Sequence, residues 1–105
     1  MATSRIDIFR MMLQGDPDNT VVWFGLAKEC EKAGRPAEVV EALTEYLGRA
    51  DDEGNAYGML ARAYTSLGNR EAARRAYQRG AEVALAHGHP SMAEEYRATL
   101  ETDFE

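Results

Sequence analysis

Apolar residues recur at a helical spacing along the whole chain. In six segments they lie three and four residues apart, and glycine, proline or acidic residues separate one segment from the next. The pattern predicts helices over about residues 4–14, 20–33, 36–49, 54–67, 70–87 and 90–102. No stretch alternates Val, Ile or Thr as a strand would, so the sequence predicts an all-α fold of about six helices.

The residues between the segments suit helix ends. Gly34 and Gly68 can take up the left-handed turn that follows a helix. Pro36 suits a first helical turn, where its missing N–H costs nothing. Asp51 or Asp52, and Asn69, can cap the helices that follow them by accepting backbone hydrogen bonds.

The chain also matches itself at a shift of 34 residues. Residues 20–53 laid over 54–87 align Trp23 with Tyr57, Leu26 with Leu60, Ala27 with Ala61, and Gly34 with Gly68. The matching positions are those at which two packed helices would touch. A fixed period of this length is typical of a helix-turn-helix solenoid, in which each repeat buries its apolar face against its neighbour.

These residues resemble the tetratricopeptide repeat. The first copy has the spacing Trp23-x2-Leu26-Ala27, and the second has Tyr57-x2-Leu60-Ala61. The resemblance implies a right-handed superhelical stack of antiparallel helix pairs forming one domain over residues 1–105. It divides this domain into an N-terminal half-repeat helix at 4–14, repeats at 20–53 and 54–87, and a C-terminal capping helix within 88–105. Met92, Tyr96 and Leu100, with Phe104, are expected to cover the last pair.

The chain departs from the family pattern at several positions. Val39 is larger than the usual alanine, Tyr46 replaces another small residue, and Cys30 stands where an aromatic residue is usual. The helix at 90–102 is out of phase with the repeats, so we interpret it as a cap.

The resemblance further implies a concave groove, lined by the first helix of each pair. The helix at 20–33 and the helix at 54–67 would form it, and the helix at 90–102 would close it. The predicted partner-binding residues are Val21, Phe24, Lys28, Lys32, Asn55, Met59, Arg62, Met92 and Tyr96.

The residues of this groove indicate what it could bind. An exposed Phe24 and Met59 next to Lys28 and Arg62 would suit a peptide or protein with apolar and acidic side chains. Gly58 would leave open space beside the two apolar residues. The alternative is that Phe24 and Met59 only pack on neighbouring helices. The Lys and Asn clamp with which some family members hold a terminal carboxylate is absent.

The N-terminal helix suggests a second kind of function. It is apolar over a wide arc, and half of this arc would pack on the helix at 20–33. The other half could be an interface for a second copy or a larger complex. The candidate interface residues are Ile6, Ile8, Phe9, Met11 and Met12. The alternative hypothesis is therefore a structural or assembly subunit, such as one half of a homodimer. A partly exposed cap would give the same pattern.

Charge and composition narrow the classes of partner. The net charge of −6 opposes nucleic acid as the main ligand, although residues 54–87 are basic between two acidic regions. No apolar run approaches the roughly 18 residues of a membrane helix, so direct membrane insertion is not expected. The N-terminus does not resemble a secretory signal, and we expect a cytoplasmic location.

The sequence contains no recognisable catalytic arrangement. Cys30 is the only cysteine and is expected in the core, and no histidine lies near it in the repeat phase. His87 and His89 are too few for a structural zinc site. We therefore predict no enzyme activity, no metal and no cofactor.

Overall fold

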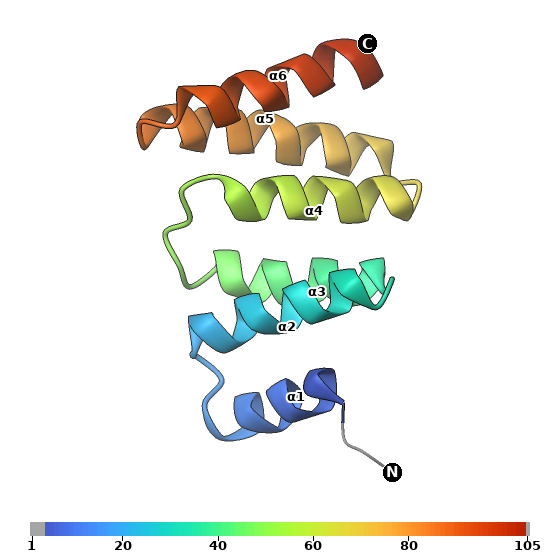
Figure 1. Cartoon of the computed structure of the whole chain (residues 1–105), viewed down its shortest axis with the longest axis vertical. Coiled ribbons are helices and arrows are strands. Elements are labelled where there is room, and N and C mark those ends of the chain that lie inside the picture. The colour runs from blue at the N-terminus through green and yellow to red at the C-terminus, as the bar shows by residue number, and fades with distance from the viewer. Residues whose placement is uncertain (1–3, 105) are drawn as a thin grey trace. The chain divides into compact units, whose positions relative to one another are not determined.

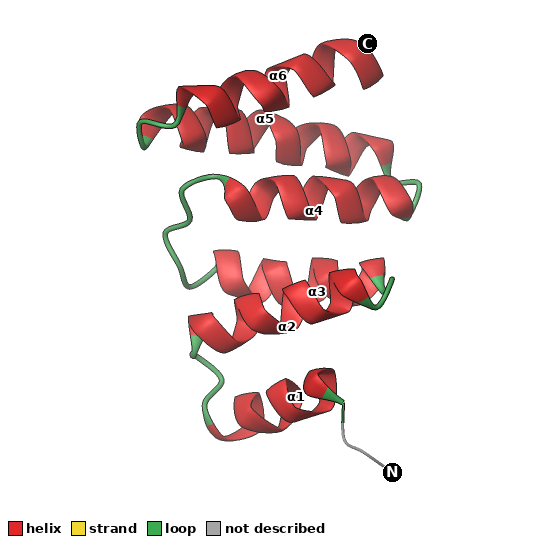
Figure 2. Cartoon of the chain, in the orientation of Figure 1, coloured by secondary structure: helices red, strands yellow, loops and turns green. Residues whose placement is uncertain are grey.

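The computed structural model describes residues 4–104, which fold into six helices joined by short loops (Figure 1). Their bounds are α1 Arg5–Gly15, α2 Thr20–Lys32, α3 Pro36–Leu47, α4 Asn55–Ser66, α5 Arg70–Ala86 and α6 Pro90–Asp103. The described part contains no strand (Figure 2). The all-α prediction is confirmed, and each helix end lies within two residues of its predicted position.

The local signals in the sequence explain these bounds. The Asn19 side chain accepts a hydrogen bond from the backbone of Val22, and Asn69 caps α5 in the same way. Gly34 and Gly68 have φ angles of 70° and 76°, as predicted for residues that follow a helix.

Asp52 has a wider role than a simple cap. Its Oδ2 atom accepts hydrogen bonds from the backbone N–H groups of Gly54 and Ala56, at 2.8 and 3.0 Å. Gly54 itself has a φ of 124°, a conformation that a residue with a side chain rarely adopts. The start of α4 therefore depends on both Asp52 and Gly54.

The chain divides into two compact units, with the boundary between Ala50 and Asp51. This boundary falls within three residues of the predicted division between the repeats at 53 and 54. The single domain over 1–105 stays a prediction, and each unit is described here by itself.

In the first unit, α2 packs against both α1 and α3. The largest fully buried side chains are Leu26, Cys30, Val39 and Leu43. The α1–α2 contact is close because Gly25 has no side chain. A Cβ atom at this position would lie 3.3 Å from the ring of Phe9.

In the second unit, α5 packs against both α4 and α6. Its core contains many alanines with three larger rings, Tyr77, Tyr96 and Phe104. Met92 and Leu100 pack against this core, which confirms the predicted covering role of α6. Small residues on α4 and α5 allow the rings to approach the backbone closely.

Tyr96 occupies the space beside two helical glycines. A Cβ atom at Gly58 would lie 2.5 Å from the Tyr96 hydroxyl oxygen, and one at Gly80 would lie 3.0 Å from the same ring. The hydroxyl donates a hydrogen bond of 3.0 Å to the carbonyl oxygen of Gly54. The prediction that Gly58 leaves open space is therefore wrong, because Tyr96 fills it.

Candidate functional site

The exposed face of α2 carries the predicted binding residues of the first unit. Val21, Phe24, Lys28 and Lys32 follow one stripe of the helix, because their spacing of three and four residues returns to the same side. Val21 is 80% exposed, and both lysines are exposed. The structure thus brings all four predicted α2 residues together.

Phe24 is held in place on this face while keeping part of its ring accessible. The ring is half-buried, and its centroid lies 5.0 Å from that of Tyr46 on α3. Lys28 Nζ lies 5.7 Å from the Phe24 centroid, within the range of a cation–π contact. An apolar surface and a positive charge are therefore adjacent.

The predicted binding residues of the second unit separate into exposed and buried groups. Asn55 and Arg62 are exposed, and Met92 is half-buried. Met59 is only 4% exposed and Tyr96 only 7%. The expectation that these two side chains are open to a partner is wrong, because Tyr96 belongs to the core cluster and Met59 is buried.

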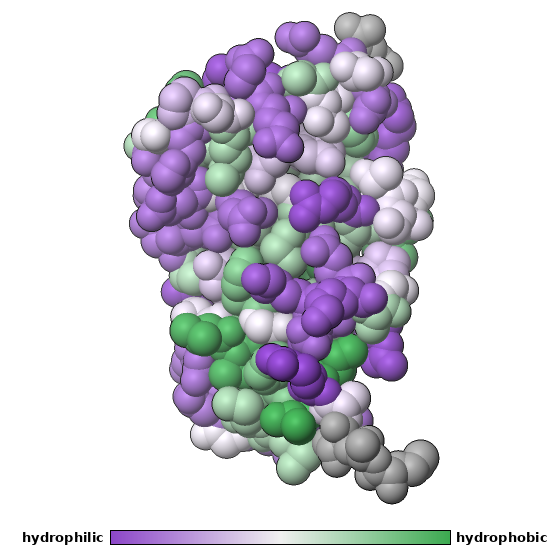
Figure 3. All heavy atoms as spheres, in the orientation of Figure 1, coloured by the Kyte–Doolittle hydropathy of each residue, from purple (hydrophilic) through white to green (hydrophobic). Residues whose placement is uncertain are grey.

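The candidate interface residues on α1 also separate into two groups. Ile6 is 7% exposed, and the Phe9 ring lies against Gly25, so both belong to the packed side of the helix. Ile8, Met11 and Met12 are 45%, 63% and 47% exposed. Only these three form an apolar surface, and hydrophobic side chains are visible around α1 and α2 in Figure 3.

A polar contact links the three helices of the first unit around Cys30. Arg10 on α1 donates a hydrogen bond of 2.6 Å to Glu38 on α3. The Cys30 sulfur, which is fully buried, lies 4.0 Å from the same carboxylate. Burial, followed by the negative charge of Glu38, raises the pKa of the Cys30 thiol. The thiol therefore packs in the core of the first unit.

The two histidines face the acidic loop before α4. His89 Nε2 lies 2.5 Å from Glu53 Oε1, and His87 Nε2 lies 3.8 Å from Asp51. The hydrogen bond from His89 lowers the pKa of Glu53, and the charge of His89 acts in the same direction. Sequence reasoning missed these carboxylates because the pairs span 36 residues. Within residues 4–104, no three such side chains gather as metal ligands would.

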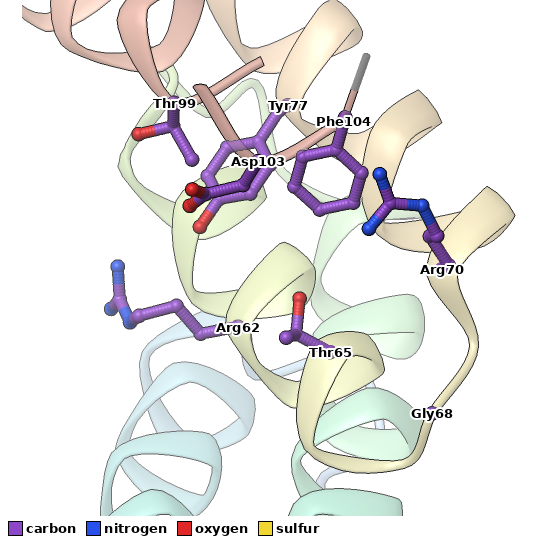
Figure 4. A pocket seen from close by; sticks show the side chains of 8 residues that line it. All are labelled: Arg62, Thr65, Gly68, Arg70, Tyr77, Thr99, Asp103 and Phe104. Atoms are coloured by element: carbon purple, nitrogen blue, oxygen red, sulfur yellow. The ribbon is translucent and has the colours of Figure 1, made fainter. Parts of the chain in front are cut away.

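A pocket of about 400 Å³ opens in the second unit, at the end of α4, the start of α5 and the end of α6 (Figure 4). Its lining residues are Arg62, Thr65, Gly68, Arg70, Tyr77, Thr99, Asp103 and Phe104. Sequence reasoning placed Arg62 on a binding surface. It missed the rest of this arrangement because three helices contribute to it.

The second predicted repeat matches a known family. Residues 54–87 match the family model described as the tetratricopeptide repeat. Residues 54–87 therefore form a tetratricopeptide repeat. The matched residues coincide with the predicted second repeat, whereas the first repeat at 20–53 stays a prediction.

Solved structures support the fold. Eleven chains of solved structures match this protein. One, described as the crystal structure of MamA, has a TM-score of 0.69 and 22% sequence identity over 93% of this chain. This chain spans 66% of the length of that MamA chain, and a likeness at this identity shows the fold alone. No curated protein matches the sequence.

The family indicates the general kind of function. Tetratricopeptide repeats are generally non-catalytic and bind proteins or peptides, so the fold indicates a protein-interaction module. None of the helices in residues 4–104 has the length and apolar character needed to cross a membrane.

Proposed function

We propose that this protein is a non-catalytic adaptor that binds a protein or peptide partner through the exposed face of α2. The observation that carries the proposal is the stripe of Val21, Phe24 and Lys28, in which apolar surface lies beside a positive charge. Apolar anchors supply most of the affinity at such surfaces, whereas charges guide approach and orientation. A partner with an apolar side chain next to an acidic one would fit this stripe.

The second unit offers its own exposed residues for the same kind of partner. Asn55 and Arg62 are exposed on α4, and they belong to the surface that the family resemblance assigns to binding. Met59 and Tyr96 are left out of the proposed contact surface because they are buried. The proposal needs no catalytic group and no cofactor.

The test compares the partner proteins that bind to the wild-type chain and to two variants. The tagged chain, a Phe24→Ala variant and a Leu85→Ala variant are used to enrich proteins from the native source, followed by quantitative mass spectrometry. Leu85 is a matched control because it is also an exposed apolar residue, at 50% exposure, and lies outside the proposed surface. We expect at least one protein to be enriched by the wild type and by Leu85→Ala but lost with Phe24→Ala.

Folding must be checked in the same experiment. Phe24→Ala removes the ring contact with Tyr46, which contributes about 0.5–1.5 kcal/mol, so its helical circular dichroism is measured beside the wild type. If a folded Phe24→Ala variant enriches the same proteins as the wild type, the α2 surface is not the binding site.

A second function has its own supporting observation. Ile8, Met11 and Met12 form an exposed apolar surface on α1, so the chain could act as an assembly subunit that docks through this helix. The double variant Ile8→Asp with Met11→Asp places two charges on this surface, at residues that are 45% and 63% exposed. It should abolish assembly and leave α2 binding unchanged.

Sedimentation equilibrium measures this second function directly. A homodimer would appear as a mass near twice 11.7 kDa that rises with concentration, and the double variant would remain at the monomer mass. A wild type that stays monomeric into the high micromolar range contradicts self-association.

A further inference from the structure

The pocket of the second unit has features that the α2 surface lacks. At about 400 Å³ it falls within the size range of sites that hold small ligands or single anchoring side chains. All of its lining residues lie between 62 and 104, so the second unit forms it alone. The size would accommodate one large apolar side chain with a polar group beside it.

The floor of the pocket is aromatic. Tyr77 and Phe104 are each only 9% exposed, and their ring centroids lie 5.8 Å apart at an interplanar angle of 64°. This edge-to-face arrangement leaves ring surface that a third aromatic ring can meet in the same way. The floor therefore favours an aromatic side chain.

Arg70, at the rim of the pocket, is available to pair with a ligand anion. Arg74, Arg75 and Arg79 on α5 each lie within 4 Å of a glutamate on the same helix, at 3.8, 3.7 and 3.3 Å. Arg70 forms no ion pair with any residue of 4–104, and its Cζ lies 4.8 Å from the centroid of the Phe104 ring. An anion at the rim, beside this ring, would be within reach of the Arg70 guanidinium.

The Tyr77 hydroxyl group is also available to a ligand. The Tyr77 hydroxyl points towards the pocket in Figure 4, and it makes no hydrogen bond with another described residue. Burial raises the pKa of Tyr77, so this hydroxyl stays protonated at neutral pH and can donate a hydrogen bond. The hydroxyl can therefore donate to a ligand oxygen that enters the pocket.

The charged residues that line the pocket favour a singly charged anion. Among the described residues that line the pocket, Arg62 and Arg70 are opposed by Asp103, and these three sum to a single positive charge. A carboxylate matches this charge, whereas a doubly charged phosphate would meet repulsion from Asp103.

We propose that this pocket binds a peptide segment in which an aromatic side chain is followed by a glutamate or aspartate. The aromatic ring lies on the Tyr77 and Phe104 floor, and the carboxylate accepts hydrogen bonds from Arg70 and the Tyr77 hydroxyl. The proposal rests on the proposed function in one respect, since it takes the ligand to be part of a protein partner.

The test uses capped dipeptide amides, so that no terminal carboxylate is present. The full chain labelled with ¹⁵N is titrated with N-acetyl-phenylalanyl-glutamyl amide, and amide shifts are followed by NMR. We expect weak, millimolar binding with shifts concentrated at residues 65–70, 77 and 99–104. Replacing glutamyl by glutaminyl, or phenylalanyl by alanyl, should weaken binding by about 3- to 10-fold, because each change removes one of the two contacts.

Two variants test whether Arg70 contacts the glutamyl carboxylate. Arg70→Gln should remove the difference between the glutamyl and glutaminyl peptides. Arg75→Gln should keep it, because Arg75 lies on the same exposed helix but outside the pocket. The proposal is overturned if the two peptides bind equally to the wild type, if the shifts map elsewhere, or if a phosphoseryl peptide binds more tightly than the glutamyl one.

This outcome is separate from that of the α2 surface. Phe24→Ala should leave the dipeptide titration unchanged, since Phe24 belongs to the first unit. If the dipeptides fail while Phe24→Ala still loses partner proteins, the pocket proposal is wrong and the proposed function stands. If the dipeptides bind as expected but Phe24→Ala loses no partner protein, the α2 proposal is wrong and the pocket proposal stands.

Discussion

At the scale of single residues, exposure decides which predicted positions can act. Phe24 and Met59 are equivalent candidates in the sequence, since each is a large apolar residue next to a base. In the structure Phe24 is half-buried under Lys28, whereas Met59 is 4% exposed. Composition and spacing could not separate them, because burial depends on contacts that residues distant in sequence supply.

Cys30 gives a prediction at this scale. Because it is fully buried and its thiol pKa is raised, little reactive thiolate should be present near pH 8. We expect a colorimetric disulfide reagent to modify the native chain at least about 100-fold more slowly than the urea-unfolded chain, since access requires opening of the fold.

The unfolded chain is the control for this measurement, because it contains the same single cysteine. Rapid modification of the native protein would mean that α1, α2 and α3 do not enclose Cys30 as described.

At the scale of helices, the sequence was most informative. Every helix was predicted with its ends within two residues, because Gly34, Pro36 and Asn69 act through local geometry that sequence shows directly. The position of Tyr96 beside Gly58 and Gly80 was not predicted, since it depends on three helices meeting. For the same reason the pocket above Tyr77 could not be found from the pattern of any one helix.

Gly80 gives a prediction at the helix scale. Helix propensity alone would make Gly80→Ala stabilising by about 1 kcal/mol. However, the added Cβ would lie 2.8 Å from the Cβ of Tyr57 and 3.0 Å from the Tyr96 ring. We expect the clash to dominate and the variant to lose about 1–3 kcal/mol in the free energy of unfolding, measured by urea denaturation.

Gly15→Ala is the matched control for this prediction. Gly15 also lies in a helix, but a Cβ atom added there would have nothing within 4 Å. This variant should be neutral or slightly more stable. A Gly80→Ala protein as stable as Gly15→Ala would contradict the close packing of Tyr96 and Tyr57 against α5.

At the scale of the whole molecule, the chain joins one recognised tetratricopeptide repeat to a second predicted one. The family indicates protein binding, and the structure offers three surfaces for it: the α2 stripe, the α1 apolar face and the pocket of the second unit. The α2 stripe is the one that both the family resemblance and the exposed residues favour. We therefore propose this stripe as the main binding surface.

Isothermal titration calorimetry with the purified partner that the enrichment identifies would measure this role directly. Phe24→Ala should raise the dissociation constant by about 10-fold or more, as expected for loss of an aromatic anchor. Met11→Asp should leave the dissociation constant within about 2-fold of the wild-type value. The opposite pattern, with Met11→Asp disrupting the complex and Phe24→Ala binding normally, would contradict binding through α2.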